Sequence, residues 1–498
     1  MMQSNARFNK LFLATYVYLA LPLLIFILTW LDYAFALILG GLFIFAGYKT
    51  LQSQQNTDAT FAIEPKIFWV AGGLAFIWCF CAGIGYFYYQ SFDYHFRNAV
   101  FRDLINFDWP VMYDKAHTPM VYYMGFWLFP ALITKITGWF ISSPDTLFII
   151  GNVYLLIYAV CGIMLIFLHL VTILKIQNWR HFLIAALIFI LFSGLDIIGY
   201  LFFMGGAQPF ALHLDWWAAF IQYSSLTTNM FWVFNQFIMT ALAILLIFNT
   251  REIKNFGFLF PLLFFVAPYP AVGIGIFMIT FAVQQFILCK EKKTFIGSEI
   301  LTIPNLIGMF WLLPIIILYF ITNSGGIDRF SFILDFISPL YLFIFMLLEF
   351  LLYAFILYPR YKKNIFFITA VVLLIIIPLF RLDQQNNFCM RVSVPALIVL
   401  SLFALMFLFE SFKERKNYIS RMILIALLCL GTATPLMEFY RGIYYVFEAK
   451  KINLVKDDIY TLNQSYIRMP EFGYEVNHQF TARYWQTDIF WQYIAKKY

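Results

Sequence analysis

Charged side chains are scarce in this sequence. Only 12% of its 498 residues are charged, in a total of 26 acidic and 33 basic side chains. A soluble domain carries roughly 25% charged residues, because its surface has to be hydrated. The composition therefore excludes an ordinary soluble enzyme. The net charge of +7 is small for this length, and the basic residues sit in short loops, so we expect no nucleic acid as a partner.

Cysteine is also sparse, and its spacing shows no metal-binding pattern. The six cysteines lie in or beside apolar segments and form no CxxC pair. We therefore expect neither a zinc site nor a disulfide framework. Convincing repeats and a soluble catalytic domain are lacking as well, so any chemistry must come from the loops and polar residues of an apolar chain.

What the sequence has in excess is hydrophobic residues. They make up 63% of the chain, include 62 Phe, and give a mean hydropathy of +0.80. Apolar runs of about 20 residues predict transmembrane helices, because a helix satisfies its own backbone hydrogen bonds in lipid. Such runs occupy residues 11–30, 33–48, 67–89, 146–171, 182–203, 231–249, 256–289, 300–320, 337–358, 365–380, 392–410 and 422–440. The predicted fold class is an all-α, polytopic integral membrane protein whose bilayer partner is the plasma (inner) membrane.

Lysine and arginine in the loops predict the orientation of the chain. Cytoplasmic loops are enriched in these residues. The basic loops are the N-terminus and residues 49–66, 172–181, 250–255, 290–293, 359–363 and 413–421. Placing them inside leaves on the extracytoplasmic side the loops 90–118, 204–230, 321–336 and 381–391 and the tail 441–498.

Two segments do not fit a simple alternation of the loops between the two sides of the membrane. Segment 256–289 is too long for one helix, and we predict that it breaks at Ala267-Pro-Tyr-Pro-Ala271, because proline interrupts helices. Segment 119–138 contains two prolines and a lysine, and we predict an interfacial or re-entrant helix. The count is then about thirteen spans, with the N-terminus cytoplasmic and the C-terminus extracytoplasmic.

The predicted organisation has three parts. They are an N-terminal transmembrane hairpin with its cytoplasmic loop, residues 1–66; a transmembrane core, residues 67–440; and an extracytoplasmic tail, residues 441–498.

The predicted outer loop 90–118 alternates charged and aromatic residues, which is typical of an amphipathic helix on the membrane surface. Asp93 and Arg97 stand at positions i and i+4 on its more apolar face, and His95 lies on another face. An acid in apolar surroundings has a raised pKa and suits a catalytic base. The alternative is a surface helix with one ordinary ion pair.

Segment 205–236 is rich in hydroxyl, amide and tryptophan side chains and has no Lys or Arg. This mixture suits a sugar, whose hydroxyl groups need hydrogen-bond partners and whose C–H faces stack on aromatic rings. The candidate substrate-binding residues here are His213, Asp215, Trp216, Asn235 and Gln236. The alternative is an aromatic belt at the membrane interface.

Loop 381–391 has an arginine at each end, Arg381 and Arg391, with amides between them. Arginine forks suit phosphate oxygens, so both are candidates to hold a lipid-linked phosphate, and Arg97 is a third. The alternative is a pair of ordinary loop cations.

Glu349 lies well inside the predicted span 337–358, and Asp196 lies in the outer half of 182–203. A charge near the bilayer centre costs about 2.5–3.5 kcal/mol on insertion scales, so such residues usually pair or function. We favour structural pairing inside the helix bundle, whereas a transporter would use them as proton or substrate sites.

Several motifs occur together in a recognisable order. They are Asp93-Tyr-His95 after a helix, His117-Thr-Pro119 before an aromatic run, Lys135-Ile-Thr-Gly138, Tyr223-Ser-Ser, Phe234-Asn-Gln236, and Phe388-Cys-Met-Arg391-Val-Ser-Val-Pro395. Over roughly residues 67–410 this order resembles the GT-C superfamily of integral-membrane glycosyltransferases, and especially its poorly characterised bacterial members.

The resemblance implies a GT-C-like fold and a polyprenyl-phosphate sugar donor. The sugar would pass on the extracytoplasmic face to an envelope glycan, lipid or protein acceptor. Asp93 takes the place of the family's early-loop acid, which acts at the acceptor or at a divalent metal ion, and His117 lies in the turn before the aromatic run. This chain departs from the pattern in having Tyr94 where many relatives have a second acid, and in its extra hairpin 11–48. Both leave the base and the metal requirement open.

The leading hypothesis is therefore a glycosyltransferase with Asp93 as base, helped by His95. A transporter or flippase of a lipid-linked or small solute, and a non-catalytic envelope assembly protein, are the alternatives.

Overall fold

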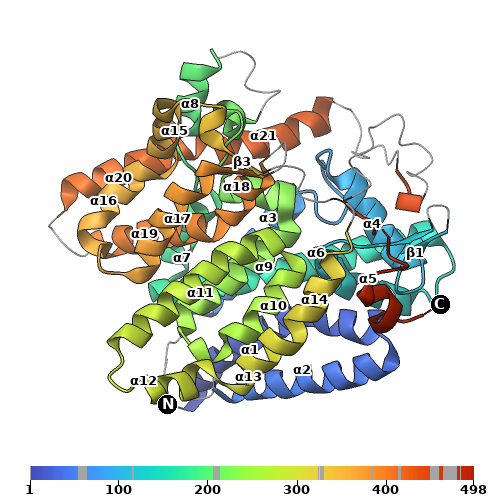
Figure 1. Ribbon diagram of the computed structural model, residues 1–498. Helices are drawn as coiled ribbons and strands as arrows, with labels where there is room; N and C mark the ends of the chain where they lie inside the picture. Colours follow the sequence, from blue (N-terminus) through green and yellow to red (C-terminus); the bar gives the residue numbers. More distant parts are fainter. Residues whose placement is uncertain are drawn as a thin grey trace.

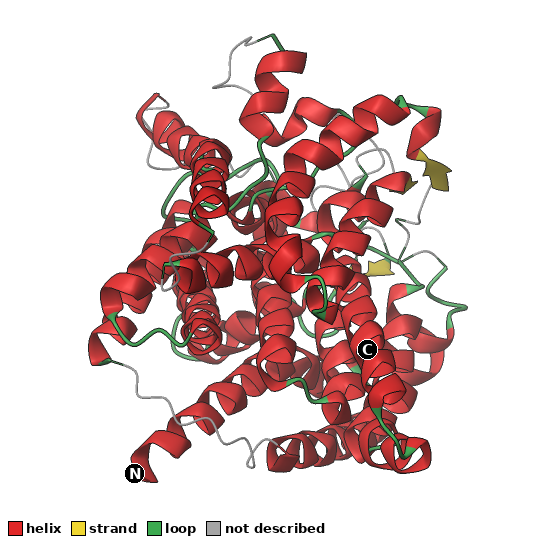
Figure 2. Ribbon diagram, turned by 90° about the vertical axis from the view of Figure 1, so that its left-hand side faces the viewer, coloured by secondary structure: helices red, strands yellow, loops and turns green. Residues whose placement is uncertain are grey.

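The computed structural model is almost entirely helical (Figures 1 and 2). It describes residues 2–53, 64–114, 117–205, 213–323, 325, 330–382, 386–412, 417–448, 459–463, 479–482 and 484–497. Within these ranges, nine helices are long and apolar enough to cross a membrane, and five shorter apolar helices accompany them. The chain is thus a polytopic helical membrane protein, as the composition predicts.

The helices are numbered in chain order. In the first third they are α1 (Met2–Trp30), α2 (Tyr33–Ser53), α3 (Pro65–Cys81), α4 (Tyr94–Asn106), α5 (Gly125–Thr137) and α6 (Pro144–Leu174). In the middle they are α7 (Trp179–Ile190), α8 (Asp196–Phe203), α9 (Leu226–Thr250), α10 (Phe256–Val266), α11 (Pro268–Leu288), α12 (Lys292–Phe295), α13 (Ile303–Ile307) and α14 (Leu313–Phe320). In the last third they are α15 (Pro339–Met346), α16 (Leu352–Tyr361), α17 (Ile365–Ile376), α18 (Asn387–Val392), α19 (Val394–Ser411), α20 (Tyr418–Gly431) and α21 (Ala433–Glu448).

Short 3₁₀ and π turns join or interrupt these helices. The 3₁₀ turns are η2 (Leu214–Ala218), η3 (Ile253–Asn255), η6 (Ile333–Asp335) and η8 (Ile377–Leu379). The π turns are η4 (Ile296–Ile300), η5 (Gly308–Leu312), η7 (Leu347–Leu351) and η10 (Phe490–Ile494). Two small antiparallel pairs complete the described structure: β1 (Met112–Tyr113) with β2 (Thr118–Pro119), and β3 (Phe330–Phe332) with β4 (Phe380–Leu382).

Two helices form the centre of the bundle. Within the span Leu226–Thr250, which is α9, 94% of the most apolar window is buried in protein, and within Asn387–Ser411 the figure is 89%. Helix α9 is buried on all sides, which is typical of a helix surrounded by other helices. The hairpin α1–α2 runs along one edge in Figure 1, and α2 is only 33% buried, so it presents most of its surface to lipid.

The predicted break in segment 256–289 is confirmed. Helix α10 ends at Val266 and α11 begins at Pro268, so the chain breaks at Ala267. Proline fits the first position of a helix, where its missing N–H is not needed. Segment 119–138 forms a helix of 13 residues, α5, which is shorter than a typical span.

The prediction of one continuous span over residues 182–203 is wrong. Helix α7 ends at Ile190, residues 191–195 are irregular, and α8 begins at Asp196. The packing of Gly194 explains the break, because a Cβ atom there would lie 2.1 Å from Oε2 of Glu349. The freed backbone finds partners in other helices: the amide of Leu195 donates to the carbonyl of Leu348 at 3.0 Å.

The last described segments of the chain return to its first third (Figure 1). Met120 pairs with Thr481 and Leu31 with Ala495 in isolated antiparallel bridges. The amide of Val121 donates to the carbonyl of Phe480 at 2.9 Å. These contacts place a C-terminal segment directly beside the candidate site.

Candidate functional site

Helix α4 carries the acid that the sequence singles out, and its surroundings differ from those expected. Asp93 immediately precedes the helix, and the next residue, Tyr94, fixes the start by donating its hydroxyl to the carbonyl of Ala82 at 2.7 Å and stacking on Phe234. Residues 96–105 are all buried, so α4 is not the membrane-surface helix that its amphipathic pattern predicts. Helices α5 and α6 and the ring of Phe480 cover it.

The predicted ion pair between Asp93 and Arg97 is present. Nη2 of Arg97 lies 3.0 Å from Oδ2 of Asp93; the arginine side chain is 7% exposed and the aspartate side chain 41%. The other terminal nitrogen of Arg97, Nη1, is buried and has no hydrogen-bond partner in the described part of the chain. Buried donors are rarely left unpaired, so this N–H marks a place where an acceptor from a ligand fits.

Arg391, from α18, joins this pair across the bundle. Its Nη1 donates to the hydroxyl of Tyr123 at 3.1 Å, and the ring of Tyr123 lies 3.9 Å from that of Tyr122. Tyr122 is within electrostatic range of both arginines, and Arg391 is within range of Asp93. We call the five residues Asp93, Arg97, Tyr122, Tyr123 and Arg391 the arginine–tyrosine cluster. It combines one acid that reaches solvent with two cations and two phenols.

The structure places three other predicted site residues with different partners. The guanidinium of Arg381, on β4, lies over the rings of Phe220 and Phe336, at 4.4 and 4.7 Å. The ring of His95 packs against Phe92. His117 adopts a left-handed backbone, and its carbonyl accepts a hydrogen bond from the indole of Trp485 at 2.7 Å, a contact that links two segments of backbone.

His213 lies in a buried network that the sequence did not predict. Its Nδ1 is 2.5 Å from Oε1 of Glu438, Arg441 contacts both residues, and the indole of Trp232 donates to Oε2 of Glu438 at 3.3 Å. Glu438 and Arg441 come from α21, 225 residues further along the chain. Their signal in the sequence is an acid and a base three residues apart at the end of an apolar segment. The exposed ring of Trp216 packs beside His213 at 4.6 Å.

A second buried group contains three acids. The indole Nε1 of Trp217 donates to both Asp196 and Glu349, at 3.3 and 3.1 Å. Asp196 also accepts from the hydroxyls of Ser193 and Thr434, at 2.8 and 2.7 Å. The structural pairing expected for these acids is thus present.

Asp215 lies close to the same group, away from the arginine–tyrosine cluster. Its burial, with the nearby carboxyl groups of Asp196 and Glu438, raises the pKa of Asp215 well above its ordinary value. Asp215 is 1% exposed, so protein encloses its carboxyl group.

Asn235 and Gln236 lie inside α9, just after a kink at Val233, where φ is −140° and ψ is 42°. Both side chains are 1% exposed, and no hydrogen-bond partner of their amide atoms is found among the described residues. They are therefore polar groups in the middle of the helix bundle. At the kink, Trp232 and Phe234 face different parts of the protein.

A metal site does not emerge from the part of the chain that the structure describes. Within it, no three His, Cys, Asp or Glu side chains are grouped so that they could hold a metal ion. Asp93 is paired with the cationic Arg97, whose charge repels a metal cation.

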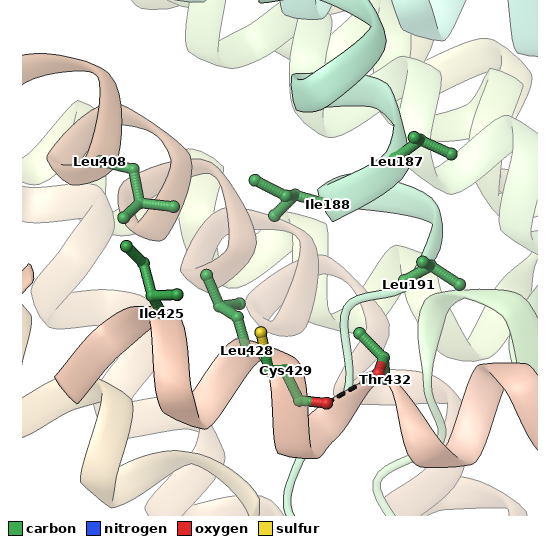
Figure 3. Close-up of a pocket in the computed structure, with 8 residues that line it drawn as sticks. All are labelled: Leu187, Ile188, Leu191, Leu408, Ile425, Leu428, Cys429 and Thr432. Carbon is green, nitrogen blue, oxygen red and sulfur yellow. Dashed lines mark hydrogen bonds between the residues drawn. The ribbon is translucent and has the colours of Figure 1, made fainter. Parts of the chain in front are cut away.

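An apolar groove of about 160 Å³ lies between α7, α19 and α20 (Figure 3). Its lining is Leu187, Ile188, Leu191, Leu408, Ile425, Leu428, Cys429 and Thr432. The hydroxyl of Thr432 donates to the carbonyl of Cys429 at 2.7 Å, so it is already satisfied. The groove suits hydrocarbon, and the polar side-chain atoms in its lining are the satisfied hydroxyl of Thr432 and the thiol of Cys429.

Asp103, near the end of α4, makes stability depend on pH. It accepts hydrogen bonds from the hydroxyl of Tyr113 and the amide of Leu462, both at 3.0 Å. Burial raises the pKa of Asp103 from 3.8 to about 7. The unfolded chain loses this proton near the lower value and the folded protein near the higher one. Between them the free energy of unfolding should therefore fall as pH rises, by at most about 1.4 kcal/mol per pH unit.

Replacing Asp103 by Asn should flatten this dependence, because the amide keeps an acceptor oxygen and does not titrate. Melting temperatures of the purified protein from about pH 4.5 to pH 8 measure the effect. Asp108→Asn, an exposed acid near the end of the same helix, is the matched control. Equal pH slopes in the wild type and Asp103→Asn would contradict the assignment.

Comparison with known proteins adds no assignment to this geometry. No family model, no curated protein and no solved structure matches the chain.

Proposed function

We propose that the protein is a glycosyltransferase of the GT-C kind that uses a polyprenyl-phosphate sugar on the extracytoplasmic face. One observation carries the proposal: Asp93, Arg97 and Arg391, predicted separately as base and phosphate ligands from loops almost 300 residues apart, lie in one cluster. The proposal includes the orientation predicted from the basic loops, with about thirteen spans. It places the cluster at the membrane edge, where a lipid-linked donor presents its head group.

The cluster has a distinct task for each charge. Asp93 accepts the proton of the acceptor hydroxyl as the acceptor oxygen bonds to the anomeric carbon of the sugar. The bond from that carbon to the phosphate oxygen breaks, and its electron pair leaves with the polyprenyl phosphate. Nη1 of Arg97 and the guanidinium of Arg391 hold this phosphate and stabilise its growing charge. Tyr123 orients Arg391 through the hydrogen bond at 3.1 Å.

Binding of undecaprenyl phosphate to the purified chain tests the donor site. Arg391→Ala should weaken binding by about 10–100-fold, since a hydrogen bond to a charged group contributes about 1.5–3 kcal/mol. Arg391→Lys should restore binding only in part, because lysine lacks the fork that matches phosphate.

Arg381→Ala is the matched control for this measurement. Arg381 packs on Phe220 and Phe336, and Arg391 on Tyr123, so the Arg381 variant should bind the lipid like the wild type. Unchanged binding in Arg391→Ala, or an equal loss in both alanine variants, would remove the cluster from the donor site.

A transporter is the second candidate, and one observation favours it. The chain breaks between α7 and α8 next to buried Asp196, and Glu349 lies opposite in the π turn η7. Broken helices beside buried acids are a feature of transporters, and π turns are frequent at functional sites. Both carboxyl groups accept a hydrogen bond from the same indole N–H. In a transporter they would share one proton, and the gain or loss of this proton would be coupled to movement of the substrate.

A further inference from the structure

A small pocket with several polar lining residues lies near the start of α4. It is formed where the turn between α3 and α4 packs on α9 and α21. Its lining residues are Ala82, Tyr89, Ser91, Phe231, Trp232, Glu438 and Arg441. The enclosed space is about 10 Å³, which is room for one water-sized group.

Two polar atoms of this pocket have no partner within the described ranges. They are the hydroxyl oxygen of Ser91 and Nε of Arg441, and both residues are 7% exposed. They come from elements 350 residues apart in the sequence. Native proteins rarely leave buried polar atoms unpaired, and each unpaired group costs about 1–3 kcal/mol. The pocket is therefore suited to a group that both accepts and donates hydrogen bonds.

The charges around the pocket argue against an anion. Nη1 of Arg441 is already 3.1 Å from Oε1 of Glu438, so this carboxylate neutralises the cation. The carboxylate of Glu438 would repel a second anion here. A neutral hydroxyl group fits instead, because its oxygen accepts from Nε of Arg441 and its proton is available to Ser91 or Glu438.

The walls and the position of the pocket suit a carbohydrate. Tyr89, Phe231 and Trp232 supply the aromatic surface on which sugar C–H groups pack. Ser91 is two residues from Asp93, so their Cα atoms are at most about 7 Å apart, a distance that one sugar ring can bridge. The kink at Val233 lets Trp232 line this pocket while Phe234 packs under Arg97.

We propose that this pocket recognises one hydroxyl group of the sugar handled at Asp93, and that Ser91 and Arg441 are specificity-determining residues. The inference rests on the proposed function, since it assigns the pocket to the same substrate. On this proposal, the residues that select the sugar lie outside the arginine–tyrosine cluster.

The test uses the purified full-length chain in detergent and a panel of methyl pyranosides with their monodeoxy analogues. Saturation-transfer NMR ranks their binding. In the wild type, removal of one particular hydroxyl should weaken binding at least about tenfold, as expected for a lost hydrogen bond to a charged group. In Ser91→Ala that discrimination should fall to about threefold or less, because one of the two partners is gone.

Ser91→Ala should fold normally, because its hydroxyl has no partner to lose among the residues that the structure describes. Ser91→Thr is the second variant: it keeps the hydroxyl but adds a methyl group that fills the space, so it should weaken binding of every glycoside. Ser143→Ala, which changes only the first turn of α6, is the control and should behave like the wild type.

Two results would overturn the proposal. One is a wild-type chain that binds none of the glycosides, which would mean that the pocket holds a structural water only. The other is unchanged discrimination in Ser91→Ala. Arg391→Ala separates this failure from that of the donor site, because it should lose undecaprenyl phosphate yet keep the glycoside ranking.

Discussion

Replacing Asp93 by Asn should lower glycosyl transfer by about 10²–10⁴-fold, the usual range for loss of a general base. The amide cannot take a proton, although its oxygen can still accept the hydrogen bond from Arg97 that the structure shows at 3.0 Å. Because asparagine keeps the shape of aspartate and an acceptor for the buried Arg97, the melting temperature should change little. Complementation of a surface-glycan phenotype in the native host is the first assay.

Glu349→Gln is the comparison that separates the two candidate functions. Gln keeps the shape of Glu and one acceptor for the indole of Trp217, so it should preserve transfer far better than Asp93→Asn does. The reverse pattern, in which Glu349→Gln abolishes function and Asp93→Asn retains it, would replace the transferase with a proton-coupled transporter.

Gly308→Ala should be the most destabilising small substitution in the bundle. A Cβ atom at Gly308 would lie 1.9 Å from the carbonyl oxygen of Gly257, so the π turn η5 and helix α10 would have to move apart. Overpacking of this kind typically costs about 1–3 kcal/mol, and contact with backbone favours the upper end because no side chain can rotate away. Thermal unfolding of the purified protein measures the loss.

Gly73→Ala provides the matched control, since the helical Gly73 has open space around its Cβ position. Alanine has the higher helix propensity, so this variant should melt at the wild-type temperature or slightly above it. If the two alanine variants had equal stability, the close approach of α10 to η5 would not limit packing.

The predictable part of this fold is the part that depends on hydropathy and proline. The apolar runs predicted helices because only helices satisfy the backbone in lipid, and Pro268 predicted the break before α11. The break at 191–195 had no such signal. It depends on how closely Gly194 approaches Glu349, a contact between segments far apart in sequence. The prediction that α4 lies on the membrane surface was wrong for a related reason. An amphipathic pattern shows that one face of a helix needs apolar neighbours, but it does not show whether these are lipid or protein.

The site was predictable where its residues are local. The spacing of Asp93 and Arg97 predicted their ion pair, because residues four apart face each other on a helix. The arginine fork predicted a phosphate-like partner for Arg391, but no pattern revealed that Tyr123 would hold it. Glu438 and Arg441 were missed since they end an apolar segment, and their role depends on a turn 350 residues earlier.

The return of the chain to its beginning has a consequence for biogenesis. Phe480 stacks on Phe96 and packs against Tyr122, and the backbone of residues 480–482 bonds to residues 119–121. One wall of the site is therefore synthesised 364 residues after the segment that it covers. Helix α4 enters the membrane early and stays incompletely covered until residues 480–482 emerge from the ribosome. A chain truncated before residue 480 should therefore lack this wall and be inert.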